Sequence, residues 1–304
     1  MKSVKRIILI SLLAIAMIPV SCTRQDKVKP TKNVILMVPD GTSTSVLSVV
    51  RWYRQHQNPQ NGTVTLATDP YLCGLVRQNC SDSPIAASPA AMTSFMTGYK
   101  AQGSNLSVYP ARNEGQDLVN VNADSTWQPL STVMEAAKIL GHKSTGLVVT
   151  VIATHATPGA TTAHTVSRSD NYNIIRQMAS NRVDVVFGGG VNYMDDDVKS
   201  ILDDNGISYI EKDVPAFRAA DKAPVWSLFS DEDMAFDLDR DTLAEPSLCE
   251  MTEKALSLLS KDKNGFFLMV EGSKVDYAAH SNDPMGVISE YDAFDKAVAV
   301  AMDF

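Results

Sequence analysis

The most informative stretch of the chain is Phe266-Phe-Leu-Met-Val-Glu-Gly-Ser-Lys-Val-Asp-Tyr-Ala-Ala-His280. Its first five residues are an apolar run of strand length. Glu271 stands at the end of this strand, and Asp276 and His280 are four positions apart, which places them on one face if the chain turns helical. A carboxylate and an imidazole on one face are a natural pair of zinc ligands, although a solvated Asp–His pair is the better explanation of these two residues taken alone.

A second strand and helix are expected near the beginning of the chain. Residues 33–38 (Asn-Val-Ile-Leu-Met-Val) form an apolar run, and residues 42–44 (Thr-Ser-Thr) can cap a helix that runs towards residue 55. Asp40 follows the strand, and Gly41 permits a tight turn. Open α/β sheets bind ligands at the carboxyl ends of their strands. Taken alone, however, an Asp-Gly pair after a strand usually marks only a turn.

The remaining periodicity predicts an α/β fold: a mostly parallel central sheet with helices on both faces. We expect residues 192–245, which are acidic and weakly periodic, to form peripheral loops and short helices, and residues 289–304 to be helical to the last residue. The other expected elements are strands at 146–152, 183–187 and 266–270 and helices near 130–140, 172–181 and 247–259.

The first 32 residues predict export and lipid attachment. Residues 1–21 form a signal peptide, with a basic start and an apolar run over 7–20 that is short for a membrane span. Cys22 follows small residues, as in a bacterial lipoprotein processing site, and would carry the lipid, although Pro19 stands where such sites usually have Leu. Residues 22–32 form a tether and residues 33–304 a single domain. We therefore expect a cell-envelope protein, lipid-anchored or else periplasmic or extracellular.

Charge and cysteine content limit the partners. The formal charge is −8, and residues 1–21 carry three basic and no acidic side chains, so the chain from Cys22 carries −11. General nucleic-acid binding is thereby disfavoured, whereas a small phosphate ester can bind where metal ions supply positive charge. Cys73 and Cys80 could form a disulfide in an oxidising compartment or remain buried or idle thiols, and the sequence leaves both possibilities open.

The stretch over residues 266–280 closely resembles the alkaline phosphatase signature Val-Glu-Gly-x-x-x-Asp-x-x-x-His. In that family the Glu binds magnesium, and the Asp and His bind the first zinc. The resemblance therefore implies an alkaline phosphatase-like fold and metal-dependent hydrolysis of small phosphomonoesters. It assigns Glu271 to Mg²⁺ and both Asp276 and His280 to Zn²⁺. Members of the family are often dimers, so it also allows a homodimer.

Two more segments resemble the family. Asp40 matches the carboxylate that bridges the second zinc and the magnesium, with Pro39 where the family usually has Gly. Residues 155–168 resemble the Ala-Thr-Pro block followed by Ser-Arg. Thr157 would give its hydroxyl to magnesium, Arg168 would grip two phosphate oxygens with its planar fork, and His155 would lie close to the magnesium site.

The resemblance places the nucleophile at Ser88. Family members carry a Ser ten residues before the Gly of a Thr-Gly dipeptide, here Gly98. Pro89 suits a first helical position, which makes Ser88 an expected N-cap near backbone N–H groups that favour phosphate; a helix cap without catalysis is the alternative. The family has an Asp directly before this Ser, where this chain has Ala87, so Arg168 would be held less firmly. Ser83 follows an Asp but at the wrong distance.

The implied mechanism is in-line attack by Ser88, giving a phosphoserine that is then hydrolysed. Two Zn²⁺ and one Mg²⁺ would activate the Ser hydroxyl and stabilise the leaving oxygen. Arg168 would neutralise charge on the other phosphate oxygens.

The ligand count is incomplete, because the family also needs an Asp-His pair and a further His beyond residue 280. The five His of this chain, at 56, 142, 155, 164 and 280, include none preceded by Asp. Magnesium has its three ligands, the first zinc has two of three, and the second zinc has Asp40 and Ser88 of four. We therefore expect a fragment whose C-terminal part is missing, or a truncated gene product. The coding sequence after residue 304 would distinguish the two.

Two other functions remain open. The chain could be a catalytically impaired lipoprotein that binds metal or phosphate. Alternatively it could be a phosphodiesterase or sulfatase relative, against which Arg168 and the Ala-Thr-Pro block argue.

Overall fold

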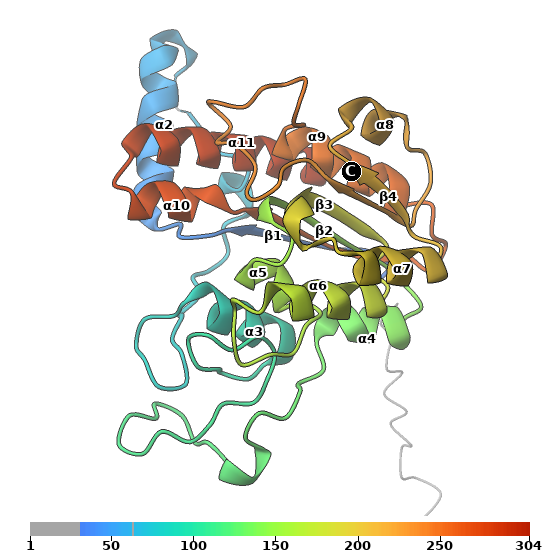
Figure 1. The fold of residues 1–304 in the computed structure, drawn as a ribbon. Helices are drawn as coiled ribbons and strands as arrows, with labels where there is room; N and C mark the ends of the chain where they lie inside the picture. The colour runs from blue at the N-terminus through green and yellow to red at the C-terminus, as the bar shows by residue number, and fades with distance from the viewer. Residues whose placement is uncertain (1–30, 63) are drawn as a thin grey trace, which may run out of the picture. The chain divides into compact units, whose positions relative to one another are not determined.

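A six-stranded sheet forms the centre of the part of the chain that the structure describes (Figure 1). The strand order is β1-β6-β2-β3-β5-β4, and all five ladders are parallel, which confirms the predicted fold class. The strands are β1 (Val34–Pro39), β2 (Ser144–Ile152), β3 (Val185–Gly189), β4 (Ser208–Glu211), β5 (Val225–Leu228) and β6 (Phe266–Gly272).

This computed structural model describes residues 31–62 and 64–304, and residues 32–304 form one compact unit. The predicted signal peptide over 1–21, the lipidation site Cys22 and nearly all of the tether lie outside the described residues. None of the helices in the described ranges has the length and apolar character needed to span a membrane.

Helices cover both faces of the sheet (Figure 1). Neighbouring strand residues point to opposite faces: Phe266, Leu268 and Val270 pack in one apolar cluster, while Phe267 and Met269 pack in the other. The first cluster includes residues of α2 (Thr44–Gln57), α8 (Val214–Ala219), α9 (Leu248–Leu259) and α11 (Pro284–Asp303); the second includes residues of α3 (Ser88–Thr97), α4 (Val133–Ile139), α6 (Asn171–Ser180) and α7 (Asp196–Asp204). Two short helices, α5 (Ala156–Gly159) and α10 (Lys274–His280), and four 3₁₀ turns, η1 (Pro59–Asn61), η2 (Asp69–Tyr71), η3 (Ala123–Ser125) and η4 (Val191–Tyr193), complete the elements.

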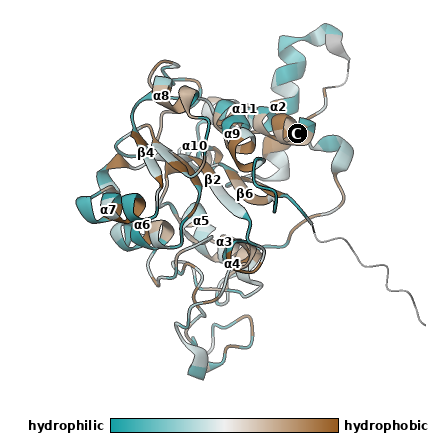
Figure 2. Ribbon diagram, turned by 90° about the vertical axis from the view of Figure 1, so that its right-hand side faces the viewer, coloured by the Kyte–Doolittle hydropathy of each residue, from teal (hydrophilic) through white to brown (hydrophobic). Residues whose placement is uncertain are grey.

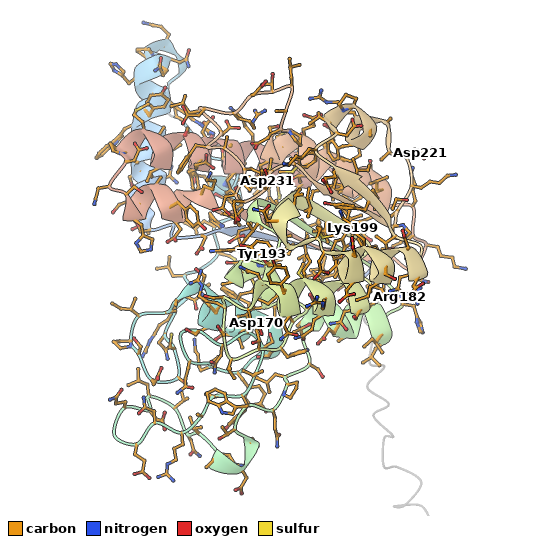
Figure 3. The ribbon with its side chains drawn as sticks, in the orientation of Figure 1. Asp170, Arg182, Tyr193, Lys199, Asp221 and Asp231 are labelled. Atoms are coloured by element: carbon orange, nitrogen blue, oxygen red, sulfur yellow. The ribbon has the colours of Figure 1, made fainter. Side chains whose placement is uncertain are left out.

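Polar residues lie on the outside of the described unit, and apolar residues form its core. Hydrophilic residues lie along the outer faces of α6 and α7, and hydrophobic residues are concentrated in the sheet (Figure 2). Charged side chains such as Asp170, Arg182 and Asp221 are exposed on the connections around the sheet (Figure 3).

The expectation of only loops and short helices over residues 192–245 is wrong, because β4 and β5 lie there together with α7 and α8. Val225–Leu228 is fully buried beside β3, and the Trp226 indole Nε1 donates to the Val183 carbonyl at 2.7 Å. Both strands have only four residues, which is too short for a periodic pattern to show.

The last helix begins earlier than predicted, at Pro284 instead of residue 289. The Asp283 carboxylate caps it by accepting hydrogen bonds from the N–H groups of Met285 and Gly286, so the turn chemistry, which apolar periodicity does not reveal, sets its start. Of the two possibilities for Cys73 and Cys80, the structure has free thiols, exposed at Cys73 and buried at Cys80.

Candidate active site

The ends of two neighbouring strands bring the predicted site residues Asp40 and Glu271 to one edge of the sheet. Strands β1 and β6 pair in parallel with Val38 opposite Glu271, and the Asp40 N–H donates to the Gly272 carbonyl at 3.2 Å. Gly41 has φ of +63°, and a Cβ there would lie 2.6 Å from the Oδ1 of Asp276. Glycine is therefore required both by the left-handed turn and by the close approach of α10.

Ser88 lies beside the carboxylate of Asp40 at this edge of the sheet. Its Oγ donates a hydrogen bond to the Oδ2 of Asp40 at 3.0 Å. The expectation that Ser88 caps α3 is wrong: Ala87 occupies the N-cap with an extended backbone, and Ser88 is the first helical residue. The Ser88 side chain is engaged by Asp40 instead of a helix N–H. The alternative nucleophile, Ser83, accepts a local hydrogen bond from the Ile85 N–H.

Glu271 is the most deeply buried charge carrier of the site, with none of its surface exposed. Its Oε2 accepts from the Ser273 hydroxyl at 2.7 Å, and the nearby Thr157 hydroxyl lowers the pKa of the carboxyl. Within the described residues, Oε1 has no hydrogen-bond partner. Burial, and then the negative charge of Asp40, raise the pKa of Glu271 to about 8.

The carboxyl of Asp40 is also buried and also has a raised pKa. Burial and then the negative charge of Asp276 raise its pKa, against the lowering effect of the Ser88 hydrogen bond. Among the described residues, no three His, Cys, Asp or Glu side chains stand close enough to hold a metal by themselves. Asp40, Glu271 and the Thr157 hydroxyl nevertheless converge, and carboxylate and hydroxyl oxygens suit Mg²⁺. An unpaired buried carboxylate oxygen beside a like charge is what a cation would neutralise, so these residues fit a metal site.

Asp276 and His280 lie on one face of α10, as predicted. The His280 Nε2 is 3.6 Å from the Asp276 Oδ2, and the two side chains are 81% and 23% exposed. His280 therefore stands at the open side of the site, whereas Asp276 points in towards Gly41.

Arg168 and His155 form a pair. The Arg168 Nη2 donates to the His155 Nε2 at 2.9 Å. Burial and then the Arg168 charge lower the pKa of His155, which keeps the ring neutral and able to accept this bond. His155 thus contacts the Arg168 guanidinium. The family's Asp would help to hold this group, but the protein has Ala87 in its place.

Sequence reasoning missed two residues behind His155. The Tyr277 ring meets the His155 ring edge-on, with centroids 5.8 Å apart, and burial and then the negative charge of Asp233 raise the pKa of Tyr277. Asp233 accepts from the Ile152 N–H at 2.8 Å. Tyr277 lies inside the signature stretch and could have been noted there. Asp233 lies in the acidic stretch of 192–245 and carries no signal of its own.

The molecule is an α/β protein with carboxylates, hydroxyls and an arginine at the carboxyl edge of a parallel sheet, the edge at which open α/β sheets bind ligands. The family model for alkaline phosphatase matches residues 31–304, so the chain belongs to the alkaline phosphatase family.

Alkaline phosphatase 4 of Bacillus subtilis is 34% identical over 295 residues, which cover 93% of this chain and 60% of that protein. The crystal structure of the cold-active alkaline phosphatase from a psychrophilic Shewanella species has a TM-score of 0.78 at 29% identity, covering 89% of this chain and 64% of that one.

A variant of the alkaline phosphatase from the Antarctic bacterium TAB5, with Mg bound in its M3 site, has a TM-score of 0.73 at 28% identity and covers 90% of this chain and 73% of that one. The chain spans 60% of the length of alkaline phosphatase 4, 58% of that of alkaline phosphatase 3 of Bacillus subtilis and 52% of that of the repressible alkaline phosphatase of Saccharomyces cerevisiae.

Proposed function

We propose that the protein hydrolyses small phosphomonoesters through a phosphoserine at Ser88 and releases inorganic phosphate. The observation that supports this most is the 3.0 Å hydrogen bond from the Ser88 Oγ to Asp40, at the edge that also holds Glu271. It places a hydroxyl nucleophile beside the carboxylates of a fitting metal site. Membership of the alkaline phosphatase family supports the same reaction class.

Metal ions would supply positive charge at the reacting oxygens. Asp40, Thr157 and Glu271 would hold one Mg²⁺, and the Mg bound by the TAB5 variant supports this choice. Asp276 and His280 would contribute to one Zn²⁺, and Asp40 and Ser88 to a second. Each zinc has only two protein donors among these residues, fewer than the three or four that zinc sites use.

The protein groups have separate tasks in the reaction. The Ser88 Oγ forms the new bond to phosphorus while the bond to the leaving oxygen breaks. Asp40 orients the hydroxyl, and the hydroxyl proton passes by way of this carboxylate to the leaving oxygen. The start of α3 offers backbone N–H groups to the phosphate. Arg168 donates to the oxygens that are not transferred. In the second step, water supplies the oxygen of the released phosphate, and the Ser88 hydroxyl is restored.

Mass spectrometry after acid quenching of the protein with zinc, magnesium and an aryl phosphate tests the proposal. We expect phosphate on the peptide that contains Ser88, loss of this label in Ser88→Ala and its retention in Ser83→Ala. A label at Ser83 would move the nucleophile. Binding of Mg²⁺ and phosphate without any label would instead support the alternative function, a protein that binds metal or phosphate without turnover.

We also propose that the protein is a lipid-anchored envelope protein, on the basis of the apolar run at 7–20 and the small residues before Cys22. Cys22→Ala should abolish labelling with radioactive palmitate and release the protein from the membrane fraction; labelling that persists contradicts the assignment. A homodimer, as is common in the family, is expected from size-exclusion chromatography with light scattering.

A further inference from the structure

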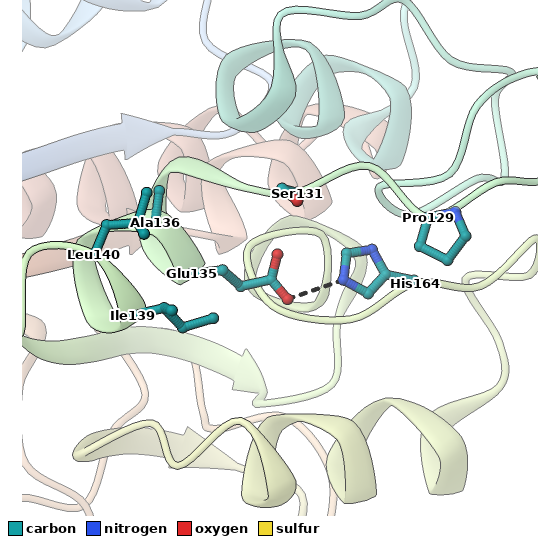
Figure 4. Close-up of a pocket in the computed structure, with 7 residues that line it drawn as sticks. All are labelled: Pro129, Ser131, Glu135, Ala136, Ile139, Leu140 and His164. Atoms are coloured by element: carbon teal, nitrogen blue, oxygen red, sulfur yellow. Dashed lines mark hydrogen bonds and ion pairs between the residues drawn. The ribbon is translucent and has the colours of Figure 1, made fainter.

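A hollow of about 310 Å³ lies beside α4, away from the strand-end residues. Glu135 and His164 point towards each other in it (Figure 4), and their side chains are 15% and 17% exposed. The rest of its lining comes from apolar residues of α4, from Leu140 directly after this helix, and from Pro129 and Ser131. His164 is not used by the reaction described above, although it lies between Thr157 and Arg168 in the chain.

Both ring nitrogens of His164 contact acceptors. Nδ1 is 2.8 Å from the Ser107 carbonyl oxygen, and Nε2 is 2.9 Å from the Oε1 of Glu135. The Glu135 carboxylate also accepts from the Thr132 N–H and from Asn181, which favours its ionised form. With Glu135 ionised, a ring between these two acceptors donates from both nitrogens, as an imidazolium does. Burial alone would lower the pKa of His164, but the bonds to Glu135 and Ser107 outweigh it and raise the pKa.

The backbone of His164 is held as firmly as its ring. Its N–H donates to the Gln177 Oε1 at 2.8 Å, and its carbonyl accepts from the Gln177 Nε2 at 3.2 Å. The next residue, Thr165, exchanges two backbone hydrogen bonds with Leu106, at 2.8 and 3.1 Å. The segment is thus fixed three residues before Arg168.

The carbonyl that His164 contacts belongs to a segment tied to the nucleophile helix. The Ser107 N–H donates to the Thr93 Oγ1 at 2.9 Å, and the Thr93 hydroxyl donates to the Asn105 carbonyl at 3.2 Å. Thr93 lies in α3, which begins at Ser88. Ser107 has φ of +43°, an unfavourable conformation for a residue with a Cβ, which persists only where its surroundings hold it.

We propose that His164 is a positioning residue that fixes the Arg168 segment relative to α3, and hence to Ser88, by bridging the Ser107 carbonyl and the Glu135 carboxylate. The proposal rests on the role of Arg168 in phosphate binding proposed above. Losing the bridge lets the Arg168 segment shift against α3, which weakens the grip on phosphate without removing any phosphate ligand.

The test measures the affinity of the protein for inorganic phosphate by calorimetry, with zinc and magnesium present. We compare His164→Gln, Glu135→Gln and Arg168→Ala, with His56→Gln as the matched control because His56 is exposed on α2. We expect His164→Gln and Glu135→Gln to weaken phosphate binding about tenfold, a typical coupling within one network. Mg²⁺ affinity should stay within about twofold, which shows that the fold and the strand-end residues are intact.

The double variant His164→Gln with Arg168→Ala separates positioning from a general structural effect. If His164 acts through Arg168, adding His164→Gln to Arg168→Ala changes phosphate affinity by less than about twofold. An equal loss in both backgrounds overturns the proposal. So does wild-type affinity in both His164→Gln and Glu135→Gln while Arg168→Ala binds weakly, a result that leaves the proposed function standing. Absence of phosphate binding by the wild-type protein overturns both. If His164→Gln fails to fold, Glu135→Gln carries the same test.

Discussion

The molecule has two polar clusters that solve burial in opposite ways. At the strand ends, Asp40 and Glu271 are two acidic groups with raised pKa values, and the Glu271 Oε1 has no hydrogen-bond partner among the described residues. Beside α4, Glu135 and His164 have opposite charges, and no atom of either is unpaired within the described part of the chain. Folding alone therefore satisfies the hydrogen-bonding groups of the second cluster, whereas the groups of the first are arranged to bind a ligand.

The largest expected effect concerns the hydroxyl at the strand-end cluster. Ser88→Ala should lower phosphomonoester turnover by at least about 10⁴-fold, because it removes the nucleophile while the rest of the site remains. Steady-state assay with an aryl phosphate measures this. Ser83→Ala is the control and should stay within about twofold. Comparable losses in both variants would contradict the assignment of the nucleophile.

The same substitution should have opposite effects on stability in the two clusters. In the metal-free protein, Glu271→Gln removes a buried charge that lacks a complementary partner, and should raise the free energy of unfolding by about 1 kcal/mol. Glu135→Gln removes the carboxylate that pairs with His164 and should lower it by about 2 kcal/mol. Urea unfolding at pH 8 in the presence of a chelator measures both. Destabilisation of similar size in both variants would erase the distinction between the clusters.

A smaller effect is expected from pH. The folded-state pKa of His164 is raised, so the stability that its charge contributes is fully present below the unfolded pKa and is lost as pH rises through the folded pKa. The charged group that contacts its ring is Glu135; Ser107 and Gln177 offer uncharged atoms. Wild type should therefore lose stability relative to His164→Gln as the pH rises above the ordinary His pKa of about 6.5. Parallel unfolding curves for the two proteins as the pH rises would show that the ring is not charged.

How much the sequence could predict depended on whether the signal was local. Strand β6 and helix α10 were predictable because the apolar run and the spacing of Asp276 and His280 lie in one stretch. The N-cap at Ala87 was not, because the hydroxyl of Ser88 binds Asp40, which is 48 residues away. Asp233 and the bridge through His164 were missed for the same reason: their partners come from distant segments that only the folded chain brings together.

The most direct test of a strand-end cation site is the thermal unfolding of wild type and Glu271→Gln as Mg²⁺ is added. A ligand that binds only the folded state at about 100 times its Kd stabilises it by about 2.7 kcal/mol, which for a chain of this size raises Tm by about 5 °C or more. We predict this rise for wild type and for Glu135→Gln, and almost none for Glu271→Gln. A Tm that does not respond to Mg²⁺ in wild type, or that rises equally in Glu271→Gln, would contradict the account.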